Sequence, residues 1–193
     1  MSSGTTDQSD LVGGSLTWRN IGSGNLMLAD ILRYFSEKVS LIESEDFDVS
    51  DTESISVYGC HFTQGAVKSF IGPLCDLYDV DCRQHDFKVE FIKRDREAGA
   101  FVDTSQMVRN GDQPLYDVSM IAESDVARRL FLTFADPQAD FQPNTAVAQR
   151  NLGAVDSVKE LPIDMRTTVL ERDEAKQRAE QMLRRYWYGR LQG

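Results

Sequence analysis

The segment 127–190 constrains the fold most, because it combines four parts in a fixed order. A strand-like run over 129–134 precedes a polar turn over 136–143, which contains an Asp-Pro and a Gln-Pro pair. A second strand-like run over 155–163 then leads to an amphipathic helix that begins near residue 172. Alternating apolar residues indicate strands, and apolar residues at steps of three and four indicate a helix. This order is typical of a structural module that docks onto another body.

The last helix is predicted to be held in place by an aromatic anchor. Its apolar stripe carries Ala175, Ala179, Met182, Leu183, Tyr186 and Trp187. Burying one tryptophan side chain removes about 150–250 Å² from water. Trp187 is therefore expected to anchor the helix on the rest of the fold.

Composition excludes several classes of function. The chain has 193 residues and 41% hydrophobic residues, enough for a core in one domain or two small ones. Its net charge is −10, and a surplus of carboxylates repels both nucleic acid and an anionic membrane surface. The longest apolar runs fall well short of the ~20 residues that a membrane span needs. We therefore expect no nucleic-acid affinity and no membrane insertion by this segment.

Charge is unevenly distributed along the chain. The segment 1–60 has ten acidic and three basic residues, whereas 166–193 has four acidic and seven basic residues. Two solvated faces explain this pattern, and so do complementary surfaces in a head-to-side assembly. Both interpretations stay open at the level of sequence.

The first part of the chain has the predicted order α-β-α-β-β. The segment 1–14 is expected to be a flexible tail. Helices are predicted over 26–39 and 64–78, a strand over 54–62, and a hairpin that pairs 80–84 with 87–93 across His85 and Asp86. The acidic segment 43–53 is predicted to be a loop.

A composition shift near 109–114 is the best internal boundary. After it the predicted order is β-β-β-α, with strands over 116–120, 129–134 and 155–163 before the last helix. Phe131 breaks the polar face of its strand, which suggests that both faces of this sheet are covered. The expected division is 1–14 as a tail, 15–110 as an α/β subdomain and 111–193 as a β-rich subdomain with a C-terminal helix.

Cysteine and histidine offer little catalytic potential. Cys60 and His61 are adjacent in a predicted strand, so they point to opposite faces and cannot form a dyad. Cys75 lies near an apolar helix stripe, and His85 lies in a predicted turn. Three cysteines without Cys-x-x-Cys spacing do not make a zinc site and are typical of a reducing compartment. No catalytic, cofactor-binding or metal-binding residue is assigned, and the chain is predicted not to be an enzyme.

Two further motifs are interpreted as turns. Gly22-Ser23-Gly24 lacks the further residues of a phosphate-binding loop. Asp136, Asp140 and Asn144 form a carboxylate-rich cluster, but Asp-Pro and Gln-Pro pairs also favour a turn. A calcium ion bound at this turn is the alternative.

Four segments together resemble one family. The first is the motif Asp136-Pro137-x-x-Asp140-Phe141-Gln142-Pro143 after the strand that begins at Leu130. The others are Leu161-Pro162-Ile163 followed by the helix over 172–190, the helix over 66–78 with Pro73-Leu74, and the hairpin over 81–91. This ordered set resembles the "putative phage tail protein" region of the tail-tip hub proteins of siphophages and gene transfer agents. The resemblance spans about 15–191.

This resemblance implies a non-enzymatic component of a phage tail-tip or baseplate hub, also called a host-specificity protein. Such hubs form a homotrimeric ring, contact the distal tail ring and other tail-tip and receptor-binding proteins, and take part in adsorption or DNA delivery. The implied location is the tail tip of the virion, after assembly in the cytoplasm of a bacterial host. Family members are much longer, so the chain is expected to be a piece of a hub or a small separate subunit.

The fold class that follows is α+β. An insertion-type α/β subdomain is expected beside a partial, tube-like β-barrel or sheet closed by the C-terminal helix. A hub module of another contractile or injection machine is the closest alternative function, and a carbohydrate- or calcium-dependent binding module is a more distant one. For the hub, we hypothesise that acidic residues such as Glu43, Asp46 and Asp48 face the lumen and repel DNA.

Overall fold

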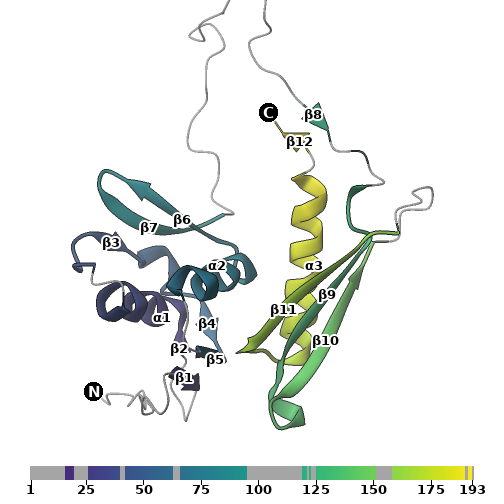
Figure 1. The fold of residues 1–193 in the computed structure, drawn as a ribbon, viewed down its shortest axis with the longest axis horizontal. Helices are drawn as coiled ribbons and strands as arrows, with labels where there is room; N and C mark the ends of the chain where they lie inside the picture. The colour runs from purple at the N-terminus through teal and green to yellow at the C-terminus, as the bar shows by residue number, and fades with distance from the viewer. Residues whose placement is uncertain are drawn as a thin grey trace, which may run out of the picture.

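The computed structural model describes residues 16–19, 26–39, 42–62, 66–94, 119–120, 122, 125–150, 158–189 and 191–192. Within these ranges, an α/β body from the N-terminal half lies beside a body of strands and one long helix from the C-terminal half (Figure 1). The fold is α+β, as predicted, and the strands that the structure describes do not close into a barrel. The tail over 1–14, the Gly22-Ser23-Gly24 turn and the strand residues 116–118 lie outside the described residues.

The N-terminal body is built from two helices and a small sheet. Helix α1 (Leu28–Tyr34) continues into a π-helical turn, η1 (Phe35–Val39), and α2 (Val67–Leu77) contains Pro73. The small sheet has the order β3 (Phe47–Asp48), β7 (Lys88–Lys93) and β6 (Val80–His85). A short pair, β2 (Leu26–Met27) with β4 (Ser56–Val57), and the 3-10 turn η2 (Ser50–Thr52) complete it.

A five-stranded sheet joins the two halves. Its order is β1 (Leu16–Arg19), β5 (Gly59–Phe62), β11 (Glu160–Val169), β9 (Arg129–Asp136) and β10 (Gln142–Gln149). Strand β11 runs parallel to β9, and the other pairs are antiparallel. Where β11 meets β5, Thr168 lies opposite Cys60. The sheet thus takes strands from both sides of the boundary predicted near 109–114.

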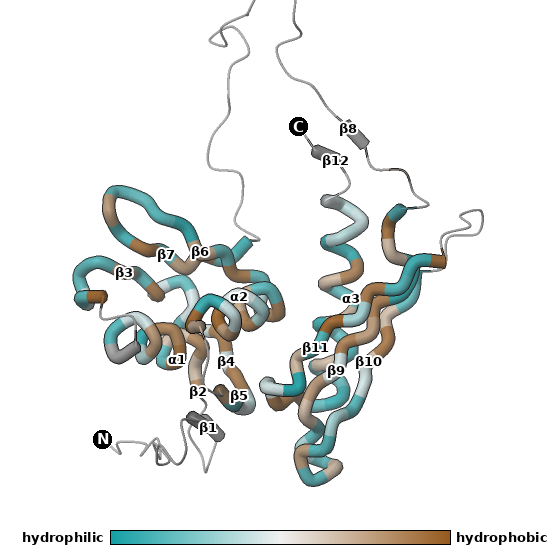
Figure 2. Tube along the Cα trace, in the orientation of Figure 1, coloured by the Kyte–Doolittle hydropathy of each residue, from teal (hydrophilic) through white to brown (hydrophobic). Residues whose placement is uncertain are grey.

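Helix α3 (Arg172–Tyr188) packs along β9 and β10 (Figure 1). Its buried stripe is the predicted one, except that Tyr186 is exposed. The short strand β12 (Leu191–Gln192) follows α3 and pairs with β8 (Ser119–Met120). Hydrophobic stretches run along α2, β4, β5 and β9 (Figure 2), so the core extends through both bodies.

Strand predictions were less accurate than helix predictions. Strand β10 was missed, β11 extends six residues beyond the predicted end at 163, and 54–62 is divided into β4 and β5. The segment 43–53 holds β3 and η2, so it is not a continuous loop. Phe131 is half-buried, and the coverage of both faces of this sheet stays a prediction.

The turn of the β6–β7 hairpin lies one residue later than predicted. His85 pairs with Lys88, so the turn residues are Asp86 and Phe87. Both have positive φ, 47° and 66°. A non-glycine residue in this left-handed region costs about 1–2 kcal/mol, and aspartate tolerates it better than phenylalanine. Because Phe87 is a turn residue, its side chain is 92% exposed and does not join the buried face with Phe91 as predicted.

Trp187 provides the first test of this packing. Its side chain is 4% exposed, its Nε1–H donates to the carbonyl oxygen of Ala127 at 2.8 Å, and the Arg150 guanidinium lies 4.7 Å from its ring centre. Trp187→Ala is expected to lower the free energy of unfolding by about 3–5 kcal/mol, since it leaves a cavity and an unpaired carbonyl. Urea denaturation measures the loss. Tyr188→Ala, at a 69% exposed position, is the control and should change stability by less than about 0.5 kcal/mol. Equal losses in the two variants would contradict the anchoring role.

Candidate functional site

The polar turn between β9 and β10 is built around the buried carboxylate of Asp136. Its Oδ1 accepts from the backbone N–H of Gln138 at 2.9 Å. Its Oδ2 accepts from Asn144 Nδ2 at 2.8 Å and from Arg172 Nε at 2.7 Å. The side chain of Asp136 is 0% exposed, whereas that of Arg172 is half exposed. We call Asp136, Asn144 and Arg172 the Asp136 clamp, because they fasten the hairpin to the first turn of α3.

Backbone contacts reinforce the clamp. The N–H of Phe141 donates to Asp136 O at 2.9 Å, and the N–H of Leu170 donates to Ala135 O at 3.2 Å. Asp140 and Phe141 have positive φ, 49° and 60°, so the chain reverses sharply before β10 begins. Pro137 begins the 3-10 turn at the position where proline removes no needed hydrogen bond. The motif found in the sequence therefore forms a structural turn.

The environment of Asp136 favours its charged form. Burial pushes the pKa of this carboxyl group upward, but the hydrogen bonds from Asn144, Arg172 and Gln138 more than offset it. The pKa of Asp136 therefore lies below the ordinary carboxyl value. Both of its oxygens are engaged by protein donors, so this carboxylate is used to hold the turn together.

The cysteine and histidine side chains do not come together as a catalytic group. Cys60 is buried and pairs across the sheet with Thr168, and burial raises the pKa of its thiol to about 12. The same cause raises the pKa of the Cys75 thiol to about 12. A nucleophilic cysteine needs a lowered pKa, so neither thiol is poised for attack. His85 lies at the end of β6 with Nδ1 3.6–3.7 Å from carboxylates of Asp86 and Glu90.

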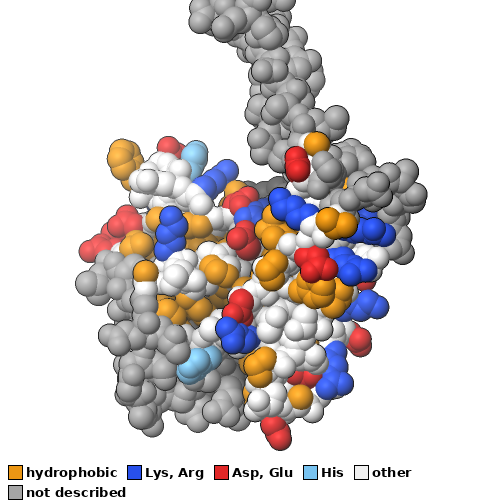
Figure 3. Space-filling view, turned by 45° about the vertical axis from the view of Figure 1, so that its right-hand side comes forward, with side chains coloured by type: hydrophobic (Ala, Val, Ile, Leu, Met, Phe, Trp, Pro, Cys, Tyr) orange, Lys and Arg blue, Asp and Glu red, His pale blue; other side chains and the backbone are white. Residues whose placement is uncertain are grey.

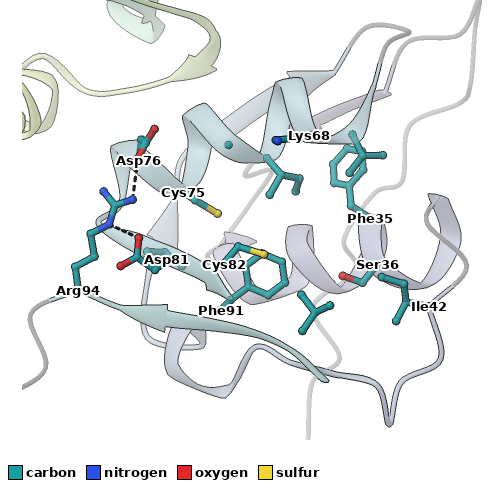
Figure 4. A pocket seen from close by; sticks show the side chains of 15 residues that line it. Phe35, Ser36, Ile42, Lys68, Cys75, Asp76, Asp81, Cys82, Phe91 and Arg94 are labelled. Atoms are coloured by element: carbon teal, nitrogen blue, oxygen red, sulfur yellow. Dashed lines mark hydrogen bonds and ion pairs between the residues drawn. The ribbon is translucent and has the colours of Figure 1, made fainter. Parts of the chain in front are cut away.

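An apolar groove lies between α2, η1 and the β6–β7 hairpin (Figure 4). Its volume is about 610 Å³. The apolar side chains that line it are those of Phe35, Ile42, Val67, Ile71, Val80, Val89 and Phe91, and we call it the α2–β7 groove. Lys68, Cys75 and Cys82 also line it, and the ion pairs of Arg94 close one end. A groove of this size and lining is suited to an apolar segment.

Ion pairs join the two bodies. Arg185 of α3 donates through Nη1 to Asp79 Oδ1, and also to the Asp76 carbonyl oxygen at 3.1 Å. Asp76 lies in the last turn of α2, where the free carbonyl groups attract a cation. Arg94 in turn bridges Asp76 at 2.8 Å and Asp81 at 2.6 Å. Seven residues earlier in α3, the Arg178 guanidinium lies 4.6 Å from the ring centre of Tyr78.

The remaining surface carries mixed charge. Positive and negative side chains are interspersed over the face shown in Figure 3, with hydrophobic side chains between them. Glu43, Asp46 and Asp48 are exposed. No three His, Cys, Asp or Glu side chains gather as a metal site in the described ranges. Among the helices that the structure describes, none is long and apolar enough to cross a membrane.

Comparison with known proteins identifies the family. The model of a family described as "Putative phage tail protein" matches residues 66–192, which is most of the chain. The chain belongs to this family. The match begins just before α2 and covers the hairpin, the Asp136 clamp and α3, the same segments on which the sequence resemblance depends.

A solved structure shares the fold. It is a chain of a particle described as "Virion of native gene transfer agent (GTA) particle", with a TM-score of 0.73 and 17% identity. The superposition covers 86% of this chain but 36% of that one, so the phage tail protein spans about a third of the length of the chain it matches. No curated protein matches the sequence.

Two parts of this arrangement were not predicted from the sequence. Phe87 was expected to be buried, and the α2–β7 groove depends on contacts between segments far apart in the chain. One feature could have indicated the positive φ of Phe87. Two-residue hairpin turns normally contain glycine, so a residue in such a turn is expected to have a positive φ.

The Asp136 clamp predicts a specific loss of stability in acid. The pKa of Asp136 is lowered in the folded state, so its contribution is complete above the unfolded pKa of about 4 and is lost as pH falls below it. Asp136→Asn should therefore lower stability near neutral pH and flatten the dependence of stability on pH between about 5 and 2. Thermal melts across this range give the profile.

Asp164→Asn is the matched control. Hydrogen bonds from Arg166 also lower the pKa of Asp164, but this pair is exposed. Exposed ion pairs contribute little, so Asp164→Asn should keep most of the acid dependence. Parallel profiles for the wild type and Asp136→Asn would contradict the role of the clamp.

The ion pairs of Arg185 predict a second stability difference. Arg185→Ala should lower the free energy of unfolding by about 1–2 kcal/mol, because it removes charged hydrogen bonds to Asp79 and Asp76 that are only partly exposed. Arg184→Ala, at the adjacent exposed position, should change it by less than about 0.5 kcal/mol. Urea denaturation of the two variants gives both free energies of unfolding. A loss in Arg184→Ala as large as that in Arg185→Ala would contradict the role of Arg185 in joining the two bodies.

Proposed function

We propose that this phage tail protein is a structural component of a phage-like tail tip, in which it forms part of a baseplate hub. The observation that carries the proposal is the family match over 66–192. The fold likeness to a chain of a gene transfer agent virion supports it. In this proposal the protein acts through contacts with the distal tail ring and with other tail-tip and receptor-binding proteins.

The proposed activity is mechanical and not enzymatic. The Cys60 and Cys75 thiols are held in the protonated form, and the Asp136 carboxylate is engaged in a structural clamp. The groove between α2 and β7 is mostly apolar, as a contact surface would be. Adsorption and DNA delivery would then depend on the position of the protein within the assembly.

The assembly would contain several copies, with a homotrimer as the proposed state. The division into 15–110 and 111–193 is retained as a proposal about two hub subdomains that share the five-stranded sheet. The exposed Glu43, Asp46 and Asp48 are proposed to face the lumen, where they would repel DNA phosphates. The protein would be assembled in the host cytoplasm and would end at the tail tip of the virion.

A hub module of another contractile or injection machine would use the same contacts and stays the nearest alternative. No observation favours a calcium-dependent module, since the donors to Asp136 occupy the oxygens that a calcium ion would need.

Immunogold electron microscopy of purified tailed particles tests the location. An antibody raised against the chain should label the end of the tail that is distal to the head. An antibody against the major capsid protein is the control and should label only the head. Label along the tube or on the head, or an absence of the chain from particles that the control labels, would contradict the proposal.

A further inference from the structure

Phe87 places a large apolar side chain in solvent and has a strained backbone conformation, and both features lower the stability of the fold. It is 92% exposed at the tip of the β6–β7 hairpin, and its φ is 66°. Glycine or asparagine would occupy this turn position with less strain and without exposing a ring to water. Strained residues persist when they serve a function, so the tip is a candidate contact.

The turn between β9 and β10 also contains a phenylalanine with positive φ, but contacts within the chain explain its conformation. Phe141 also has a positive φ, 60°, but it is half as exposed and its N–H is bonded within the Asp136 turn. The folded chain thus accounts for the conformation of Phe141. It does not account for the ring of Phe87, which lies almost entirely in solvent.

The α2–β7 groove is the complementary feature. Its volume of about 610 Å³ exceeds one water site many times over, and its lining is mainly apolar. Gly72 of α2 lines it, and a Cβ atom placed on Gly72 would meet no atom within 4 Å. Because Phe87 is exposed, the hairpin tip of the same chain does not fill this groove.

Charge is complementary as well. Asp86 beside Phe87 is 88% exposed, and Lys68 in the groove lining is exposed. Lys68 makes no ion pair with another described residue, so it is available to a carboxylate from outside. Asp76 and Asp81 also line the groove, but Arg94 forms ion pairs with both, so Lys68 is the lining cation left for a carboxylate. A tip that carries a phenyl ring and a carboxylate therefore suits the apolar walls and the ammonium group of Lys68.

We propose that the hairpin tip of one copy, Asp86 and Phe87, inserts into the α2–β7 groove of a second copy. The tip lies at the end of the β6–β7 hairpin and the groove lies beside its strands, so each copy presents both features. Two copies could therefore exchange tips reciprocally, and more copies could close a ring. This inference rests on the proposed function, because a hub needs several copies in contact. It adds the surface through which two copies would meet. It would bury Phe87 and give Asp86 the counter-charge of Lys68.

Sedimentation velocity of the full chain over a concentration series tests the contact. The wild type should show a mass that rises with concentration. Phe87→Gly should weaken self-association at least tenfold, while its melting temperature as a monomer rises because glycine relieves the strain. Tyr188→Ala is the exposed-aromatic control and should associate as the wild type does.

Substitutions at Gly72 test whether the groove itself takes part in the contact. Gly72→Leu places a side chain in the open space of the groove and should also weaken self-association at least tenfold. Gly72→Ala is the control, since one methyl group leaves the groove open. Charge exchange completes the design: Asp86→Lys should weaken the contact, and the double variant with Lys68→Asp should recover most of the loss.

A wild type that stays monomeric up to millimolar concentration would overturn the inference. Self-association that Phe87→Gly and Gly72→Leu leave unchanged would overturn it too. In both cases immunogold labelling at the tail tip would still support the proposed function. Conversely, a particle without this chain would remove the proposed function while leaving the contact between copies measurable.

Discussion

The buried carboxylate of Asp136 is the constraint around which the C-terminal half is arranged. A carboxylate with no solvent exposure is stable only where donors replace its lost hydration, and here Gln138, Asn144 and Arg172 supply them. The three donors come from the turn, from β10 and from the start of α3. Satisfying one anion therefore fixes the hairpin and the position of the helix together. The apolar stripe of α3 then packs on β9 and β10, with Trp187 buried at its far end.

The two bodies depend on each other through polar and backbone contacts. Strand β11 pairs with β9 along most of its length and meets β5 at its end, so the same strand belongs to both. Arg185 adds a charged contact from α3 to the C-terminal end of α2.

Sequence reasoning succeeded where local pattern and tertiary context agree. The helix α3 and the strand β9 have strong periodicity that matches their burial, so both were predicted with nearly correct bounds. Strand β10 was missed because its sequence, QPNTAVAQ, is polar and proline-containing, as suits an edge strand that is mostly exposed. The β6–β7 turn was predicted one residue too early because Asp86-Phe87 violates the preference for glycine at positive φ.

The motif around Asp136 was recognised as a turn, but its link to Arg172, 36 residues later, depends on the folded structure. The α2–β7 groove could not be predicted, since its walls come from segments that only the tertiary fold brings together.

The proposed function requires this protein to make contacts within a symmetric assembly. A cryo-EM reconstruction of the intact particle tests it most directly. If the proposal is correct, the map will contain several symmetry-related copies at the distal end of the tail, each in contact with neighbouring tail proteins and with its own copies. A reconstruction without the chain, or with a single isolated copy that holds a small-molecule substrate in the α2–β7 groove, would contradict it.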